Sequence, residues 1–249
     1  MTAPVPSAGD AVLELRGVSR VHGHGATQVT ALGGVDLALL PGELVAIMGP
    51  SGSGKSTLLT LAGGLDAPTS GEVVVEGESL TGMSAATLAR LRRRSVGYVF
   101  QDLNLIPTLT AAENVALPLE LDGASRRAAL RSARKSIEDL DLVELADRFP
   151  DEMSGGQQQR IAIARALVGP RRVLLADEPT GALDSQTGEA VLRLLRRRID
   201  RGAAGLLVTH DARHAAWADR IVHLRDGKVL DESAPLPPAD SLLESGTRP

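Results

Sequence analysis

The sequence predicts an α/β fold with a helical insert, and two observations support this. Short apolar segments alternate with helical segments in both halves of the chain, the pattern of a mostly parallel sheet covered by helices. Between about 102 and 155 the pattern changes. Apolar residues there recur at helical spacing with charges between them, most clearly over 124–142. This middle section therefore predicts a helical subdomain inserted into the α/β fold.

The expected elements follow from hydrophobic periodicity and from the positions of glycine and proline. In the first half we expect strands over 12–19, 32–44 (with a turn at Pro41-Gly42), 45–49, 71–80 and 96–100, and helices from Gly54 to Gly63 and over 84–94. In the second half we expect helices over 157–168 and 185–200 and strands over 173–177, 205–210 and 220–232. We expect one domain over 11–232, a flexible N-terminus over 1–10 and a disordered tail over 233–249.

Composition excludes several functions. The chain has no cysteine, which excludes disulfides, thiolate metal sites and a cysteine nucleophile. Its 27 basic and 31 acidic residues give a net charge of −4, unlike the basic domains that bind nucleic acid. The N-terminus lacks the features of a secretory signal, and no apolar run is long enough to cross a bilayer. We therefore expect no nucleic-acid partner, and any membrane-spanning part must come from another chain.

The segment GPSGSGKST at 49–57 matches the phosphate-binding P-loop pattern G-x-x-x-x-G-K-[ST]. It follows an expected strand and opens an expected helix, which is the context that the motif requires. The glycines let backbone amides surround a phosphate, Lys55 reaches the β- and γ-phosphate oxygens, and the Ser56 hydroxyl suits Mg²⁺. The predicted nucleotide-binding residues are Gly49, Pro50, Ser51, Gly52, Ser53, Gly54, Lys55, Ser56 and Thr57.

Polar residues at the ends of other expected strands suit the same chemistry. Asp177, at the end of VLLAD, suits a contact with Mg²⁺, and Glu178 suits a general base for water. A solvated acidic turn is the alternative, and the P-loop argues against it. Gln101 and His210 also follow expected strands, but each alone is more typical of a structural polar residue.

A second candidate phosphate site lies at Ser154-Gly155-Gly156, directly before an expected helix. Glycines at a helix N-terminus leave backbone N–H groups free for an anion. Without the P-loop, an ordinary serine N-cap would be the better interpretation. Arginine runs at 92–94, 126–127 and 196–198 favour solvated helix faces, with contact to an acidic partner surface as the alternative.

Taken in order, these motifs make the sequence resemble the ATP-binding cassette (ABC) family over nearly all of residues 11–232. The P-loop corresponds to Walker A, Gln101 to the Q-loop, MSGGQ (153–157) to the signature, VLLADE (173–178) to Walker B, ALD (182–184) to the D-loop and His210 to the switch histidine. The resemblance implies a RecA-like P-loop NTPase core with an N-terminal antiparallel β subdomain.

The resemblance also implies a mechanism and a set of roles. Two cassettes would dimerise head to tail on MgATP, so that Ser154, Gly155, Gly156 and Gln157 serve the nucleotide held by the partner's P-loop. Asp184 would couple the two sites. Glu178 and His210 would be catalytic, and Ser56, Gln101 and Asp177 would organise Mg²⁺. One departure is that no aromatic residue follows the first strand, so His22 is the best match for stacking on adenine.

Within the family, 103–119, 154–167 and 175–192 look like the lipoprotein-releasing and macrolide-export ATPase group, as does an extended loop over 21–32. That resemblance implies an ATPase subunit at the cytoplasmic face of the membrane, held there by separate permease subunits contacted near Gln101–Thr110. Export or force transmission is the expected task. An importer ATPase is the alternative, disfavoured because residues 211–249 leave no room for a regulatory domain. A soluble cassette protein or a non-hydrolysing regulator fits less well.

Overall fold

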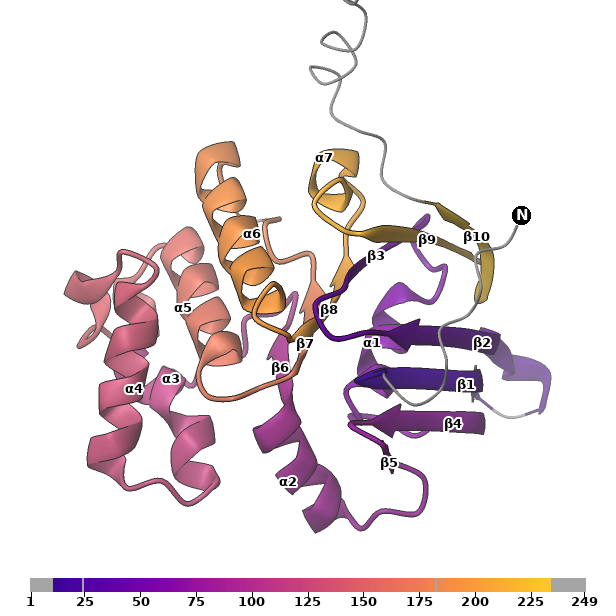
Figure 1. Cartoon of the computed structure of the whole chain (residues 1–249), viewed down its shortest axis with the longest axis horizontal. Coiled ribbons are helices and arrows are strands. Elements are labelled where there is room, and N and C mark those ends of the chain that lie inside the picture. The colour runs from indigo at the N-terminus through magenta and orange to yellow at the C-terminus, as the bar shows by residue number, and fades with distance from the viewer. Residues whose placement is uncertain (1–10, 24, 182, 234–249) are drawn as a thin grey trace, which may run out of the picture.

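The computed structural model describes residues 11–23, 25–181 and 183–233. The expected flexible N-terminus, most of the expected tail, and Ala182 of the predicted D-loop lie outside the described residues. The described chain forms two sheets and the helices that pack around them (Figure 1). Among the described residues, no helix has the length and apolar character needed to cross a membrane.

The larger sheet has six strands, and its central strands are apolar because both of their faces are covered. In spatial order the strands are β10 (Lys228–Ser233), β9 (Arg220–Arg225), β3 (Leu44–Met48), β8 (Ala204–Val208), β7 (Val173–Asp177) and β6 (Val96–Val99). All neighbours pair in parallel except β10, which is antiparallel to β9. This confirms the mostly parallel sheet predicted from the alternation of strands and helices.

The smaller sheet is antiparallel and is built from the N-terminal part of the chain. Its order is β2 (Val29–Leu39), β1 (Leu13–His22), β4 (Ser70–Val75) and β5 (Glu78–Ser79). Helix α1 (Lys55–Ala62) contacts β1 and β2 on one side and β7 and β8 on the other. The leucines of α1 complete an apolar core between the two sheets, so the start of α1 is held in one position relative to both.

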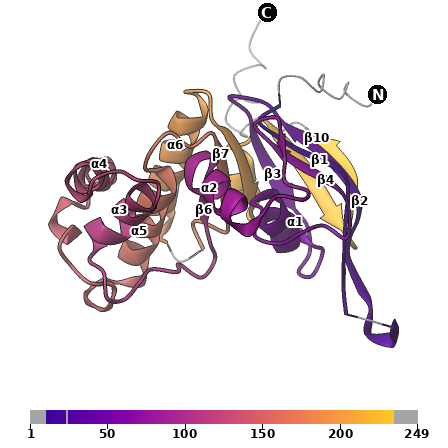
Figure 2. The same cartoon turned by 90° about the horizontal axis from the view of Figure 1, so that it is seen from below.

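The remaining helices cover the other surfaces of the large sheet. Helix α6 (Ser185–Ile199) packs on it with β8, and the short α7 (Ala212–Ala215) lies near β3. Helix α2 (Ala85–Ser95) leads into β6. Helices α3 (Ala111–Leu121), α4 (Arg126–Glu138) and α5 (Gly155–Leu167) surround a separate apolar core, and Figure 2 shows them grouped at the end opposite the small sheet.

Some expected element boundaries are wrong, and short turns explain most of them. The expected strand over 71–80 is a hairpin of β4 and β5, and that over 220–232 is a hairpin of β9 and β10. The turn residues Glu76 and Asp226 both have φ of 49°, and each precedes a glycine with positive φ. The expected loop over 21–32 is mostly the ends of β1 and β2 joined around a short 3-10 helix, η1 (Gly25–Thr27).

Candidate functional site

The P-loop lies between the end of β3 and the first residue of α1, in a space that admits only glycine at two positions. A Cβ on Gly49 would lie 2.1 Å from the carbonyl oxygen of Leu224, on β9. A Cβ on Gly54, whose φ is 103°, would lie 2.4 Å from the carbonyl oxygen of Ala31, on β2. Strands from both sheets therefore press against the loop and fix its curvature.

Lys55 bends back over this loop. Its Nζ donates to the carbonyl oxygens of Gly49 and Pro50, at 2.8 Å each. The ammonium group thus lies beside the amide groups at the start of α1, where the helix dipole also favours negative charge. Ser53 is 2% exposed, and its hydroxyl is buried without a partner among the described residues. This concentration of donors and positive charge fits a polyphosphate.

A cavity of about 460 Å³ opens above the loop and brings together most of the predicted site. Its lining from the predicted residues is Gly49, Ser51, Gly52, Gly54, Lys55, Ser56, Thr57, Gln101, Asp177, Glu178 and His210. No sequence motif pointed to four further lining residues, which are Val29, Thr30 and Ala31, at the start of β2, and Val208, at the end of β8. The three β2 residues reach the cavity because the small sheet packs beside the P-loop, which no local sequence signal reveals.

The oxygen donors suited to Mg²⁺ occupy one side of this cavity. Asp177 ends β7 and is 7% exposed, and its carboxylate forms a side-chain hydrogen bond with Ser56. Burial raises the pKa of Asp177, while the Ser56 hydrogen bond acts in the opposite direction. Gln101 adds an amide oxygen to the same lining. A hydroxyl, an amide and a carboxylate form a donor set that fits Mg²⁺ shared with phosphate oxygens.

Glu178 and His210 face each other at the mouth of the cavity. The Oε1 atom of Glu178 lies 2.7 Å from Nδ1 of His210. This hydrogen bond to Glu178 is the main cause that raises the pKa of His210. Strand β8 ends at Val208, two residues earlier than expected, so His210 is on a loop and is 79% exposed in its side chain. Glu178 has a φ of 47°, and its N–H donates to the carbonyl of Val208.

The predicted signature residues lie outside this cavity. Ser154 caps α5: its hydroxyl accepts from the N–H of Gln157 at 3.3 Å, and the Gln157 side chain accepts from the N–H of Ser154 at 2.8 Å. The two candidate phosphate segments are therefore not part of one pocket within a single chain. The ordinary capping role and the exposure of Ser154 are both compatible with a further role toward another molecule.

Asp184 caps α6 beside the candidate catalytic pair. Its carboxylate accepts from the N–H of Thr187 at 3.0 Å and from the Thr187 hydroxyl at 2.6 Å, which lowers the pKa of Asp184. Asp184 lines a second cavity, of about 200 Å³, together with Glu178 and His210. No sequence motif pointed to Thr180 and His214, which also line this cavity and whose side chains form a 3.0 Å hydrogen bond.

His22 is at the end of β1, where it pairs with Val29. His22 does not line the 460 Å³ cavity, whereas Val29, which is 63% exposed, does. On this side, the cavity lining therefore includes the exposed apolar side chain of Val29 and not the imidazole of His22.

Two polar side chains hold the segment over 101–110 by hydrogen bonds to its backbone. Asn114, 1% exposed, accepts from the N–H of Ile106 and donates to the carbonyls of Ile106, Leu109 and Thr110. Arg165, on α5, donates to the carbonyls of Leu103 and Asn104. The segment thus connects Gln101 in the cavity to the helical group.

Comparison with known proteins agrees with this geometry. The family profile described as ABC transporter matches residues 32–181. The chain is 45% identical over 225 residues to the macrolide export ATP-binding/permease protein MacB of Wolinella succinogenes, and 45% identical over 226 residues to that of Brucella abortus. These alignments cover 90% and 91% of this chain but 35% of each relative, so the chain spans about a third of their length.

Two solved structures have the same fold. One is the ATP-binding cassette MJ0796 in a dimeric post-hydrolysis state bound to ADP and Pi, with a TM-score of 0.85 and 41% identity. The other is a dimeric structure of MJ0796, a bacterial ABC transporter cassette, with a TM-score of 0.85 and 42% identity. Each comparison covers 90% of this chain and 99% of the cassette. The expected P-loop NTPase fold, with an antiparallel and a mostly parallel sheet, is confirmed.

Proposed function

Because the chain belongs to the ABC transporter family and has the complete fold of its cassettes, we propose that it is a Mg²⁺-dependent ATPase that drives a membrane permease. The observation that carries this proposal is the single cavity in which the P-loop, Asp177, Glu178 and His210 meet. A phosphate site alone would serve any nucleotide-binding protein. A carboxylate and an imidazole at its mouth add the groups needed to activate water.

The phosphate end of the nucleotide is bound by Lys55 and by the loop amides. Ser56, Gln101 and Asp177 hold Mg²⁺, which neutralises charge on the phosphates when it is bound. At the adenine end, His22 stays a prediction, and Val29 offers an apolar contact beside it. Recognition that rests mainly on the phosphates gives weak discrimination between ATP and GTP.

Glu178 acts as the general base, and His210 positions the water and the γ-phosphate. The 2.7 Å contact holds the two side chains together and, by raising the pKa of His210, favours an imidazolium that can donate to phosphate oxygens. Glu178 is then within reach of a water placed between the pair and the γ-phosphate.

Substitution Glu178→Gln tests the base directly. We expect phosphate release to fall by at least about a hundredfold, because a neutral amide cannot accept the proton of water. ATP binding should be retained, since the P-loop contacts are unchanged. The measurements are steady-state phosphate release and equilibrium binding of ATP. Glu189→Gln, on the exposed face of α6, is the matched control, and near-normal turnover by Glu178→Gln would contradict the assignment.

Hydrolysis takes place in a head-to-tail dimer of two copies, in which Ser154, Gly155, Gly156 and Gln157 contact the nucleotide of the opposite P-loop. Support comes from the position of this segment outside the chain's own cavity and from the dimeric cassettes of similar fold. Asp184, next to Glu178 and His210, couples the two sites across the same interface.

Light scattering of Glu178→Gln with and without MgATP tests this arrangement. We expect an ATP-dependent shift from monomer to dimer that is lost when Ser154→Arg is added, because the bulky side chain blocks the interface. Ser125→Arg is the matched control, since Ser125 caps α4 in the same way, through the N–H of Ala128. Equal loss of the dimer in both variants would assign the effect to helix capping, and the trans role of Ser154 would be wrong.

The partner of the dimer is a pair of separate permease subunits, which contact the segment from Gln101 to Thr110 and hold the cassette at the cytoplasmic face of the membrane. The relatives named MacB favour export or force transmission over import. Finding a neighbouring gene for a four-span permease with a large extracytoplasmic domain would support export or force transmission, whereas finding a gene for a substrate-binding protein would favour an importer.

A further inference from the structure

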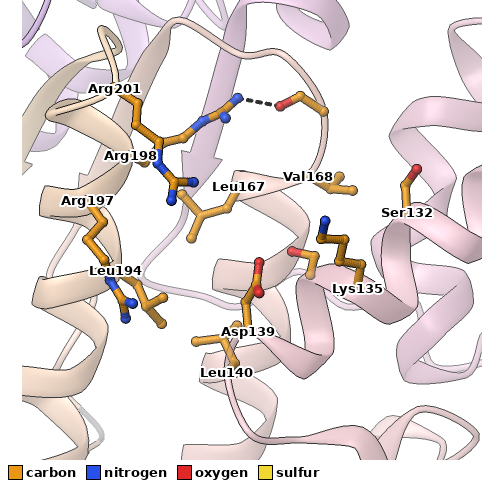
Figure 3. Close-up of a pocket in the computed structure, with 12 residues that line it drawn as sticks. Ser132, Lys135, Asp139, Leu140, Leu167, Val168, Leu194, Arg197, Arg198 and Arg201 are labelled. Atoms are coloured by element: carbon orange, nitrogen blue, oxygen red, sulfur yellow. Dashed lines mark hydrogen bonds between the residues drawn. The ribbon is translucent and has the colours of Figure 1, made fainter.

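A third cavity, which shares no lining residue with the other two, has a cationic wall that the proposed function does not use. The cavity has a volume of about 330 Å³ and lies between α4, the end of α5 and α6 (Figure 3). Its charged lining residues are Lys135, Asp139, Arg197, Arg198 and Arg201. In Figure 3 the arginines extend from the α6 side and Lys135 from the α4 side of the same space.

The charge of this wall contrasts with that of the whole chain. Four cations and one carboxylate line the cavity, although acidic residues outnumber basic ones in the protein. Among the described residues, none of these four cations makes an ion pair. Their charge is therefore available to a ligand.

The arginine run at 196–198 separates into two parts according to the direction of its side chains. Arg196 pairs with Asp200 and Asp219, and Arg193, one turn earlier, pairs with Glu189. Arg197 and Arg198, which line the cavity, have no carboxylate partner. We first expected this arginine run to form a solvated helix face. A solvated face does not explain why the arginines without an ion pair are those that line the cavity.

Arg198 is fixed at the inner end of the cavity. One guanidinium nitrogen donates to the carbonyl oxygens of Gly169 and Arg171, which orient the group without neutralising it. Its Nε atom is buried and has no hydrogen-bond partner among the described residues. Burial, and then the charges of Arg165 and Arg198, lower the pKa of Arg171, whose carbonyl accepts from Arg198, to about 10.

We propose that this cavity binds a small compound carrying two or more phosphate groups. A guanidinium presents two parallel donors that match phosphate oxygens, and a wall with a net charge of about +3 suits a multiply charged anion better than a single carboxylate. The hydroxyl of Ser132 adds a donor at the rim. The volume is at the lower end of the range for small-ligand pockets.

The apolar part of the cavity lining suits an organic group attached to the phosphates of the ligand. Leu140, Leu167, Val168 and Leu194 line the space between the cations. An organic group attached to the phosphates would cover these side chains, which inorganic phosphate would leave exposed. A nucleoside polyphosphate and the two-phosphate headgroup of cardiolipin both have this chemistry, so the source is decided by experiment.

Titration calorimetry with inorganic tripolyphosphate on the whole chain tests the site. The substitution Lys55→Ala is introduced throughout so that the P-loop contributes little to the signal. The pocket variant is Lys135→Gln/Arg197→Gln/Arg201→Gln, and the matched control is Arg90→Gln/Arg127→Gln/Arg131→Gln, which removes three exposed arginines that do not line the cavity. We expect the affinity for tripolyphosphate to fall at least about tenfold in the pocket variant and less than about threefold in the control variant.

Two results would overturn the proposal. Equal weakening in both variants would mean diffuse charge attraction, and no binding at about 1 mM tripolyphosphate in about 0.1 M salt would mean no site. Citrate and pyrophosphate carry nearly equal negative charge near neutral pH, so a site selective for phosphate should bind citrate more weakly than pyrophosphate, and equal binding would contradict phosphate selectivity. Sedimentation with phosphatidylcholine vesicles containing cardiolipin identifies the source. Binding that tripolyphosphate displaces points to a headgroup, and no binding points to a soluble phosphate compound.

Discussion

Tyr98, the only tyrosine of the chain, lies on β6 with its ring stacked on Phe100 at a centroid distance of 4.0 Å. Burial, and then the charge of Asp177, raise the pKa of its phenol to about 12, and a hydrogen bond with Thr60 acts in the opposite direction. A single side chain on β6 therefore responds to the electrostatics of the nucleotide site.

We predict that the phenol of Tyr98 stays largely protonated near pH 11 in the folded chain. Because an unfolded tyrosine ionises near pH 10, this raised pKa stabilises the fold below about pH 10, and the contribution is lost as the pH rises toward about 12. Absorbance of phenolate at alkaline pH measures Tyr98 alone. The same titration in concentrated urea is the control, and coincident curves with and without urea would contradict the prediction.

Individual residues also explain which site positions were predictable. Lys55, Ser56, Asp177 and Glu178 belong to motifs with fixed spacing, so their types and positions alone indicated phosphate chemistry. His214 had no such signal, because its hydrogen bond to Thr180 joins segments that are distant in the sequence.

Among the strands and helices, the most informative error concerns the hairpin of β9 and β10. Its turn at Asp226-Gly227 supports the P-loop, since the N–H of Gly227 donates to the carbonyl of Ser53 and its carbonyl accepts from the N–H of Gly33. The Asp-Gly pair is a strong hairpin signal, which the single strand expected over 220–232 did not take into account. Nothing local could have shown that this turn closes against the P-loop.

Asn114 connects helix α3 to the segment that we assign to the permease contact. We predict that Asn114→Ala lowers the free energy of unfolding by about 1–3 kcal/mol, because the N–H of Ile106 and the carbonyl of Leu109 lose their side-chain partner. Urea denaturation measures the loss, and faster proteolysis within 103–110 should accompany it.

Asn104→Gly is the matched control for Asn114→Ala. It removes the other asparagine of the segment, and glycine suits its φ of 50°. A change within about 0.5 kcal/mol is expected there. Equal stability of the two variants would show that the side chain of Asn114 does not support the segment.

Arg220 joins the two sheets of the molecule. From β9 it donates to Glu43 at 3.0 Å and to Glu232 at 2.6 Å, and its third donor reaches the carbonyl of Ala38, on β2, at 2.7 Å. The sequence predicted the strands of both sheets but not their junction. The packing of the small sheet beside the large one also brings Val29, Thr30 and Ala31, at the start of β2, to the cavity. No local sequence signal indicates this packing, so these lining residues were not predicted.

We predict that Arg220→Gln lowers the free energy of unfolding by about 1–3 kcal/mol, since Glu43 keeps its partly buried charge without a full partner. Urea denaturation followed by the fluorescence of Trp217, the only tryptophan, provides the measurement. Arg225→Gln is the control, because Arg225 is 67% exposed and its ion pair with Asp226 is long, at 3.8 Å. An equal effect of the two substitutions would contradict the role of Arg220 at the junction.

The contact between Glu178 and His210 has a consequence for basal turnover. The Oε1 atom of Glu178 is engaged by the imidazole of His210, so it is not free to accept a proton from water. In the proposed mechanism, His210 first turns toward a γ-phosphate oxygen, and its 79% exposure leaves room for that movement. The proposal therefore implies that the resting geometry of the site itself limits futile consumption of nucleotide.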